Sequence, residues 1–234
     1  MELLLGLIVV GGAVAAGARV RTKLFERKRA KADLDVVRRL AEEDVILLGE
    51  ELQRLDRQVS GHELDEDARR DYQTALDAYE SAQRSADHID SADQVSRIVD
   101  TLNTGRYALA CVLARAEGRP VPERRTPCFF NPQHGPATTD VLWTQPGRGT
   151  RTVPACAQDA ARQVAGENPH VRVLVVDGRR VPYWEAGELL QPYTRGYFPA
   201  TITEARRDHK AYGASFSAWP GNNYDGDFQR RDPS

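Results

Sequence analysis

The chain has 234 residues and a formal net charge of −2, and most of its basic side chains are arginine. Its three cysteines, Cys111, Cys128 and Cys156, are too few for a disulfide framework and fit a reducing compartment. Apart from one basic run near its start the chain is net acidic, which argues against broad nucleic-acid binding because that needs a basic face.

Residues 1–20 predict a transmembrane anchor. No charged residue occurs from Leu3 to Ala18, and seven basic residues follow between Arg19 and Lys31. Roughly 16 to 18 apolar residues form a helix of roughly 25 Å, at the short end of what spans a bilayer. The positive-inside rule then places the bulk of the chain on the cytoplasmic side of the cell membrane, as a single-pass protein.

A cleaved signal peptide is the alternative for this segment, because Ala13–Ala15 and Ala16–Ala18 resemble cleavage sites. Against it, the positive charge follows the apolar run instead of preceding it. Gly12 and Ala16 form a small-xxx-small pair, which favours a homo-oligomer in the membrane unless these residues simply face lipid. The basic run suits anionic headgroups, so membrane lipid is an expected partner.

Residues 21–117 predict an antiparallel three-helix bundle or coiled coil. Apolar residues recur every three or four positions in three segments, which span Leu34–Leu55, Ala68–Ala86 and Ala92–Ala116. The connections between these segments are short, and short connections make neighbouring helices antiparallel.

Two serine-led sequences predict where the second and third helices begin. Ser60–Glu63 and Ser91–Gln94 both fit the capping-box pattern, in which the serine and the acid or amide satisfy backbone N–H groups reciprocally. Within the third segment, Arg106 falls on the apolar seam. We expect it to extend its charge to the surface or to pair with an acid such as Asp71 or Glu50.

Residues 118–127 are interpreted as a linker, and residues 128–200 as a small α+β module. A knuckle, a β-hairpin, a short helix and a second hairpin follow one another in this module. They are predicted at Cys128–Gly135, at Asp140–Val153, from Pro154 to about Ala165, and at Val171–Trp184.

The order of knuckle, hairpin and helix resembles a treble-clef zinc finger, in which one Cys-x-x-Cys pair lies in the knuckle and another starts the helix. The corresponding pairs here are Cys128/Asn131 and Cys156/Asp159, and each keeps only its first cysteine. A structural zinc takes four ligands, usually thiolate or imidazole and sometimes carboxylate. The resemblance therefore implies a candidate zinc site made of Cys128, His134, Cys156 and Asp159.

Two other states of these cysteines stay open. In a metal-free remnant, Cys128 and Cys156 are buried as small apolar residues, because incomplete sites bind metal poorly in competition with the cell. A disulfide between them would require the module to lie outside the cell. The cofactor is thus unknown at this point, with structural zinc as the candidate.

The whole layout resembles uncharacterised single-pass membrane proteins of high-GC Gram-positive bacteria. These combine an N-terminal anchor, a helical stalk and a degenerate treble-clef, zinc-finger-like module. The matching motifs here are Cys128–Pro136, Val153–Cys156 and Gly178–Trp184. The resemblance implies an architecture and a location, but no known activity.

No catalytic motif is recognisable, because the five histidines are scattered and no P-loop, Rossmann fingerprint or nucleophile elbow occurs. We therefore expect a membrane-anchored cytoplasmic scaffold or adaptor that binds a protein partner or a second copy, without catalysis and without nucleic acid. One alternative is a zinc-finger-like module that binds nucleic acid through its arginines. Another is an uncharacterised thiol- or metal-dependent enzyme with Cys128 or Cys156 beside His134.

Residues 201–234 are expected to be a flexible tail.

Overall fold

The computed structural model describes residues 2–145, 149–176 and 178–198, with side chains from residue 21 onward. The predicted flexible tail, residues 201–234, lies outside the described residues, as do the side chains of the predicted anchor, residues 1–20. Among the described residues, no helix is both long enough and apolar enough to cross a membrane.

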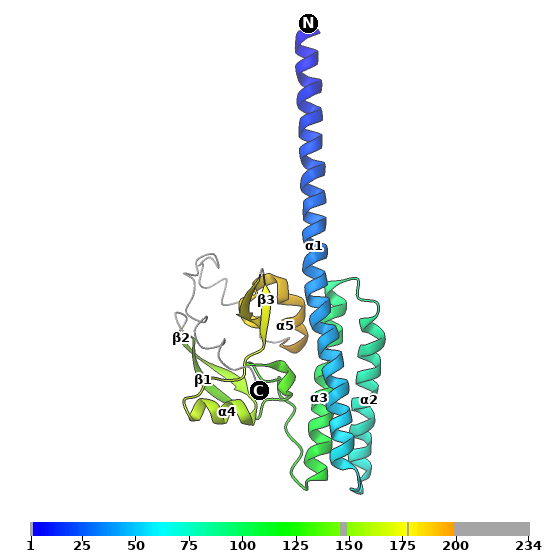
Figure 1. Cartoon of the computed structure of the whole chain (residues 1–234), viewed down its shortest axis with the longest axis vertical. Helices are drawn as coiled ribbons and strands as arrows, with labels where there is room; N and C mark the ends of the chain where they lie inside the picture. Colours follow the sequence, from blue (N-terminus) through cyan, green and yellow to red (C-terminus); the bar gives the residue numbers. More distant parts are fainter. Residues whose placement is uncertain (1, 146–148, 177, 199–234) are drawn as a thin grey trace. The chain divides into compact units, whose positions relative to one another are not determined.

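Three long helices make up the first part of the fold (Figure 1). They are α1 (Glu2–Val59), α2 (Glu66–Ala86) and α3 (Ala92–Ala116). α1 descends in the view, α2 returns alongside it and α3 descends again, so helices that follow one another in the chain are antiparallel. Each of the three helices contacts the other two.

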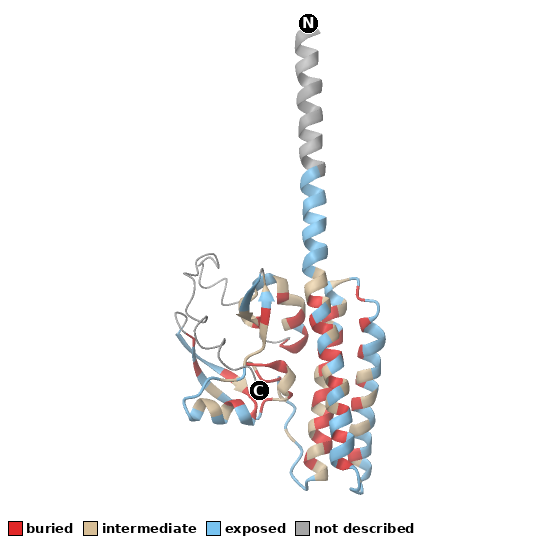
Figure 2. Ribbon diagram, viewed as in Figure 1, coloured by how far each residue is buried: buried red, intermediate tan, exposed pale blue. Residues whose placement is uncertain are grey.

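The predicted apolar seams line the core between these helices (Figure 2). Leu48 of α1, Ala75 of α2 and Leu102 of α3 are completely shielded from solvent. Alanine recurs along the buried face of α2, and its short side chain lets the neighbouring helices approach closely. Leucine and valine from α1 and α3 fill the space that these alanines leave.

The two predicted helix starts have different outcomes. At the start of α3 the capping box is present, and the side chain of Gln94 accepts a hydrogen bond from the backbone N–H of Ser91 at 3.2 Å. The prediction for Ser60–Glu63 is wrong, because α2 begins later. Its N-cap is Asp65, whose carboxylate accepts from the backbone N–H of Ala68 at 2.6 Å.

A small α+β part follows the helices. It begins with η1 (Pro132–His134), β1 (Thr139–Gln145), β2 (Gly149–Ala155), α4 (Ala157–Val164), β3 (Val173–Val176) and β4 (Arg179–Pro182), and three short helical elements complete it. Each pair of strands forms an antiparallel two-stranded sheet, in which Trp143 lies opposite Arg151 and Val176 lies opposite Arg179. The order of knuckle, hairpin, short helix and hairpin is as predicted, although residues 146–148 and 177 lie outside the described residues.

The predicted knuckle is closed by pairing at its base. An isolated bridge joins Pro127 to Pro136, and the backbone N–H of Cys128 donates to the carbonyl of Gly135 at 3.0 Å. Gly135 has a φ of +77°, a conformation that glycine adopts without strain. This part has a small core of its own, formed by Cys128, Phe130, Trp143, Val153, Ala155 and Cys156.

Three short helical elements that the sequence did not predict end the described chain. They are η2 (Tyr183–Glu185), η3 (Gly187–Leu190) and α5 (Gln191–Tyr197). α5 packs on α3, where the hydroxyl of Ser96 donates to the carbonyl of Pro192 at 2.7 Å. Tyr193 and Tyr197 are fully buried in the same core as the three long helices. The α+β part is therefore packed onto the helices through its C-terminal end.

Candidate metal centre

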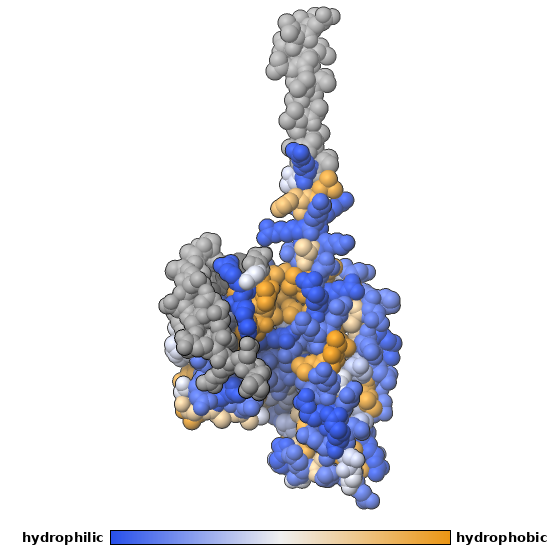
Figure 3. Space-filling model, viewed as in Figure 1, coloured by the Kyte–Doolittle hydropathy of each residue, from blue (hydrophilic) through white to orange (hydrophobic). Residues whose placement is uncertain are grey.

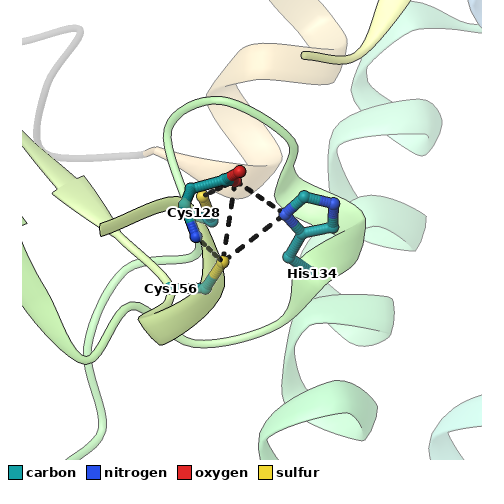
Figure 4. A group of neighbouring side chains, drawn as sticks. Cys128, His134 and Cys156 are labelled. Carbon is teal, nitrogen blue, oxygen red and sulfur yellow. Dashed lines mark hydrogen bonds and ion pairs between the residues drawn. The ribbon is translucent and has the colours of Figure 1, made fainter. Parts of the chain in front are cut away.

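The four side chains proposed from the sequence as zinc ligands lie together in space, and Figure 4 shows Cys128, His134 and Cys156 of this set. They are Cys128, His134, Cys156 and Asp159. One potential ligand atom from each can be chosen so that all four atoms lie within 4.8 Å of one another. The structure thus joins residues that are as far as 31 positions apart in the chain.

Local structure explains how each side chain reaches the cluster. Cys128 follows the bridge at the base of the knuckle, and His134 ends the short helix η1 within it. Cys156 is the N-cap of α4, and its sulfur accepts from the backbone N–H of Asp159 at 3.5 Å. Asp159 lies in the first turn of α4, where an acidic side chain is favoured by the helix dipole.

The distances within the cluster match a tetrahedral site. Zinc bonds of about 2.3 Å to sulfur and about 2.0–2.1 Å to nitrogen or oxygen place sulfur about 3.5 Å from a neighbouring nitrogen or oxygen ligand. The Cys156 sulfur lies 3.5 Å from Nδ1 of His134 and 3.6 Å from Oδ2 of Asp159. The Cys128 sulfur lies 3.3 Å from the same oxygen, and His134 Nδ1 lies 2.9 Å from it. These separations need only small adjustments to hold a metal ion.

The cluster is closed to solvent. Cys128 and Asp159 are completely shielded and Cys156 is 8% exposed, while the side chain of His134 is 16% exposed. A structural zinc site typically has four protein ligands and no open position, whereas a catalytic site keeps one position for water or substrate. The burial therefore favours a structural role.

A second histidine, which sequence reasoning missed, supports the cluster from outside. Nδ1 of His170 lies 2.8 Å from Nε2 of His134, and the two rings are stacked. The backbone N–H of His170 also donates to Oδ1 of Asp159 at 2.8 Å. Such outer partners fix the orientation and tautomer of a histidine ligand. No spacing rule would have identified His170, because its contacts depend on the loop after α4.

Asn131 occupies the position where a treble clef carries its second cysteine, but it is not in the cluster. Its side-chain oxygen accepts from the backbone N–H of Gln133 at 3.0 Å and caps η1. Its side-chain nitrogen lies 3.3 Å from Nε2 of His134. Asn131 therefore shapes the turn that carries His134, and His134 takes the place of the missing cysteine.

The four side chains of the cluster shift one another's pKa values. A hydrogen bond from the Cys128 thiol, helped by His134, lowers the pKa of Cys156 to about 5, and the same thiol pair raises the pKa of Cys128. Burial opposes ionisation of Asp159, but hydrogen bonds from His134 and His170 lower its pKa to about 2. Burial also disfavours charge on His134, yet Asp159 and Cys156 raise its pKa to about 9. Without a metal ion, protonated His134 therefore balances part of the negative charge of Cys156 and Asp159, and a bound cation would take the place of that proton.

All three cysteines are free thiols, so the disulfide considered for Cys128 and Cys156 does not occur in this structure. The alternative of a thiolate nucleophile is disfavoured by burial, because a reactive cysteine is usually partly exposed to its substrate.

Two of the arginines behind the nucleic-acid alternative interact within the protein. The guanidinium of Arg172 is paired with Asp44 and Glu43, at 3.3 and 3.0 Å. The guanidinium of Arg151 lies over the rings of Phe129 and Trp143. An arginine already engaged in this way gives up existing contacts when it binds a phosphate, so these two do little to support that alternative.

Compared with known proteins, the chain matches no family model, no curated protein and no solved structure. Its function is therefore argued from its own residues and their geometry.

Proposed function

We propose that the protein is a membrane-tethered scaffold whose α+β part is organised around a structural zinc ion and which acts by binding another protein or a second copy of itself. The observation that carries the proposal is the buried cluster of Cys128, His134, Cys156 and Asp159. Two thiolates, an imidazole and a carboxylate at tetrahedral separations are a donor set that suits zinc better than the oxygen-seeking ions magnesium and calcium.

The orientation of His134 fits this role. Its Nδ1 faces the cluster, and its Nε2 faces Nδ1 of His170. With the proton on Nε2, His134 donates to His170 and keeps Nδ1 free to bind a metal ion. Zinc would hold the knuckle to the start of α4, two segments that otherwise share only a small core.

The membrane tether is supported by the sequence and by the exposure of the segment that follows it. Residues 1–20 carry the apolar run, and residues 21–33 of α1 are all exposed. In Figure 3 this exposed segment is largely hydrophilic, in keeping with its basic side chains. A basic helix directly after an apolar run suits the headgroup region on the cytoplasmic side.

Metal analysis of the purified full-length protein tests the zinc site. We expect about one equivalent of zinc in the wild type and a near-complete loss in Cys156→Ser and Asp159→Asn, because a four-ligand site tolerates few losses. Cys111→Ser is the matched control. Cys111 is also a buried free thiol, but it lies in α3 and is not part of the cluster.

Wild-type protein that carries no zinc and takes up none when zinc is supplied would contradict the proposal and would favour the metal-free remnant. Equal loss of zinc from Cys111→Ser would also contradict it, because the loss would then reflect unfolding and not the removal of a ligand.

The scaffold role is tested by affinity capture of the full-length protein from detergent-solubilised membranes. We expect a stoichiometric protein partner or a second, differently tagged copy of the chain. Recovery of the chain alone, at the mass of a monomer, would count against a scaffold.

A further inference from the structure

A buried carboxylate marks the place where the α+β part meets the helices. Asp44 of α1 is completely shielded from solvent. Its Oδ1 accepts hydrogen bonds from Gln133 at 2.5 Å and from Arg172 at 3.3 Å. Its Oδ2 accepts from the hydroxyls of Tyr193 at 2.6 Å and Tyr197 at 2.7 Å. A carboxylate offers about four acceptor positions, so Asp44 is fully satisfied.

All four of these donors come from the α+β part, and none comes from α2 or α3. Two belong to α5, one to η1, and one precedes β3. A buried carboxylate is costly unless it is paired and hydrogen-bonded, so Asp44 is tolerated at this position only while the donors are in place. Burial raises the pKa values of Tyr193 and Tyr197 well above their usual value, which keeps both hydroxyls protonated as donors.

Two of the four donors lie close in the chain to residues of the candidate metal centre or to residues that support it. Gln133 precedes His134 in the three-residue helix η1, and the two side chains bind Asp44 and the cluster respectively. Arg172 lies two residues after His170, whose backbone N–H binds Asp159. The backbone N–H of Arg172 donates to the carbonyl of Phe130 in the knuckle at 2.9 Å. The conformation that forms the cluster therefore also presents half of the donors to Asp44.

We infer that metal binding at the cluster and docking of the α+β part on α1 are thermodynamically linked through Gln133, Arg172 and Asp44. The inference rests on the zinc site proposed above. A metal ion that fixes the knuckle holds Gln133 and Arg172 where Asp44 needs them, and docking on Asp44 holds the knuckle in its metal-binding shape. Linkage is reciprocal, so each event must strengthen the other by the same factor.

The first test measures zinc affinity by competition with a chromophoric chelator in the full-length protein. We expect Asp44→Asn and Gln133→Ala each to bind zinc about 10-fold more weakly than the wild type, the lower end of what outer partners of a metal site contribute. Asp77→Asn and Gln73→Ala are the controls, because these two side chains bond to each other on the exposed face of α2. Both controls should match the wild type.

The second test needs no variant. Hydrogen exchange of the wild-type protein is compared with zinc bound and after zinc has been removed by a chelator. We expect faster exchange in α5 and in α1 around Asp44 after removal, with the contact between α2 and α3 unchanged.

The outcomes separate the two proposals. Zinc bound with equal affinity by all variants, or exchange in α5 that does not respond to zinc, would overturn the linkage and leave the zinc site intact. A wild-type chain that binds no zinc would overturn both.

Discussion

At the scale of single residues, Arg106 shows what a sequence pattern leaves open. Its place on the apolar seam of α3 is as predicted, and it is buried. It pairs with an acid, as predicted, and does not extend its charge to the surface, but that acid is neither Asp71 nor Glu50. The guanidinium instead binds the side chain of Glu51 at 3.2 Å, the hydroxyl of Tyr197 at 2.7 Å and the backbone carbonyl of Asp44 at 3.2 Å.

The reason is geometric. Helical periodicity fixes the face on which a residue lies, but it does not fix the rotation and offset of the neighbouring helix that decide between Glu50 and Glu51. Tyr197 could not be named at all, because the sequence did not predict α5. Asp71 pairs with Arg115 instead, at 3.1 Å.

Arg106→Ala is expected to lower the free energy of unfolding by about 3–5 kcal/mol, because Glu51 loses its buried partner and the hydroxyl oxygen of Tyr197 loses the guanidinium that donates to it. Arg115→Ala is the control, since the Arg115 side chain is 27% exposed and paired at the surface. It should change stability by about 1 kcal/mol or less. Chemical denaturation of both variants measures the difference, and similar losses would show that the Arg106 network has no special weight.

The candidate ligands were predictable because treble-clef spacing places a residue in the knuckle and another at the helix start. Their supporting contacts were not. His170, Gln133 and Arg172 reach the cluster or Asp44 through loops whose path no periodicity encodes. From the sequence alone, a polar residue in a loop has many possible hydrogen-bonding partners, and nothing distinguishes among them.

At the scale of elements, the long helices and both hairpins follow from patterns that repeat over many residues. α5 has only seven residues and contains Pro192 near its start. It makes less than two helical turns, so its two buried tyrosines are too few to show a helical periodicity in the sequence. The helix is stabilised by packing against the long helices, and it lies very close to α3. A Cβ atom added at Gly196 would lie 2.5 Å from the carbonyl oxygen of Ser96 and 2.7 Å from Cβ of Val99.

Gly196→Ala should therefore force α5 away from α3 and lower the free energy of unfolding by about 1–3 kcal/mol, the usual range for overpacking. Gly105→Ala in α3 is the matched control. Its added Cβ would lie 3.0 Å from a side-chain carbon of Leu48 and 3.1 Å from Cβ of Ala78, which is tight but involves no backbone atom, so the loss of stability should be smaller than for Gly196→Ala. Thermal or chemical denaturation distinguishes the two. A Gly196→Ala protein as stable as the wild type would show that α5 is loosely held.

The start of α2 marks the limit of boundary prediction. Ser60 fits a capping box in the sequence, yet Asp65 caps the helix. Ser60 is followed by Gly61, which is a poor helix former and adopts a φ of +89°. Asp65 is followed by Glu66 and Asp67, whose acidic side chains suit the first turn of a helix. The capping-box pattern alone therefore does not decide where a helix begins.

At the scale of the whole molecule, the proposed tether predicts which side of the membrane the protein occupies. All three native cysteines are buried, so they are poor sites for labelling. A Ser60→Cys variant places a thiol at an exposed position between α1 and α2. We expect a membrane-impermeant maleimide to label this thiol only after cells are permeabilised, because the proposed topology places the basic run and the chain after it on the cytoplasmic side.

A chain that begins at residue 21 provides the comparison for location. It should leave the membrane fraction, while the full-length protein stays in it. Labelling of Ser60→Cys in intact cells, or membrane retention without residues 1–20, would contradict the proposed topology.

The continuity of α1 from Glu2 to Val59 has a further consequence. Every residue inserted into the exposed stretch 21–33 would turn all that follows by about 100° and shift it by about 1.5 Å. The number of residues in this stretch thus sets the direction, about the axis of α1, in which the candidate metal centre faces. Insertions of about seven or eleven residues nearly restore that direction, because they come close to whole numbers of turns. Natural or engineered length variation here should be tolerated in such steps and poorly tolerated one residue at a time.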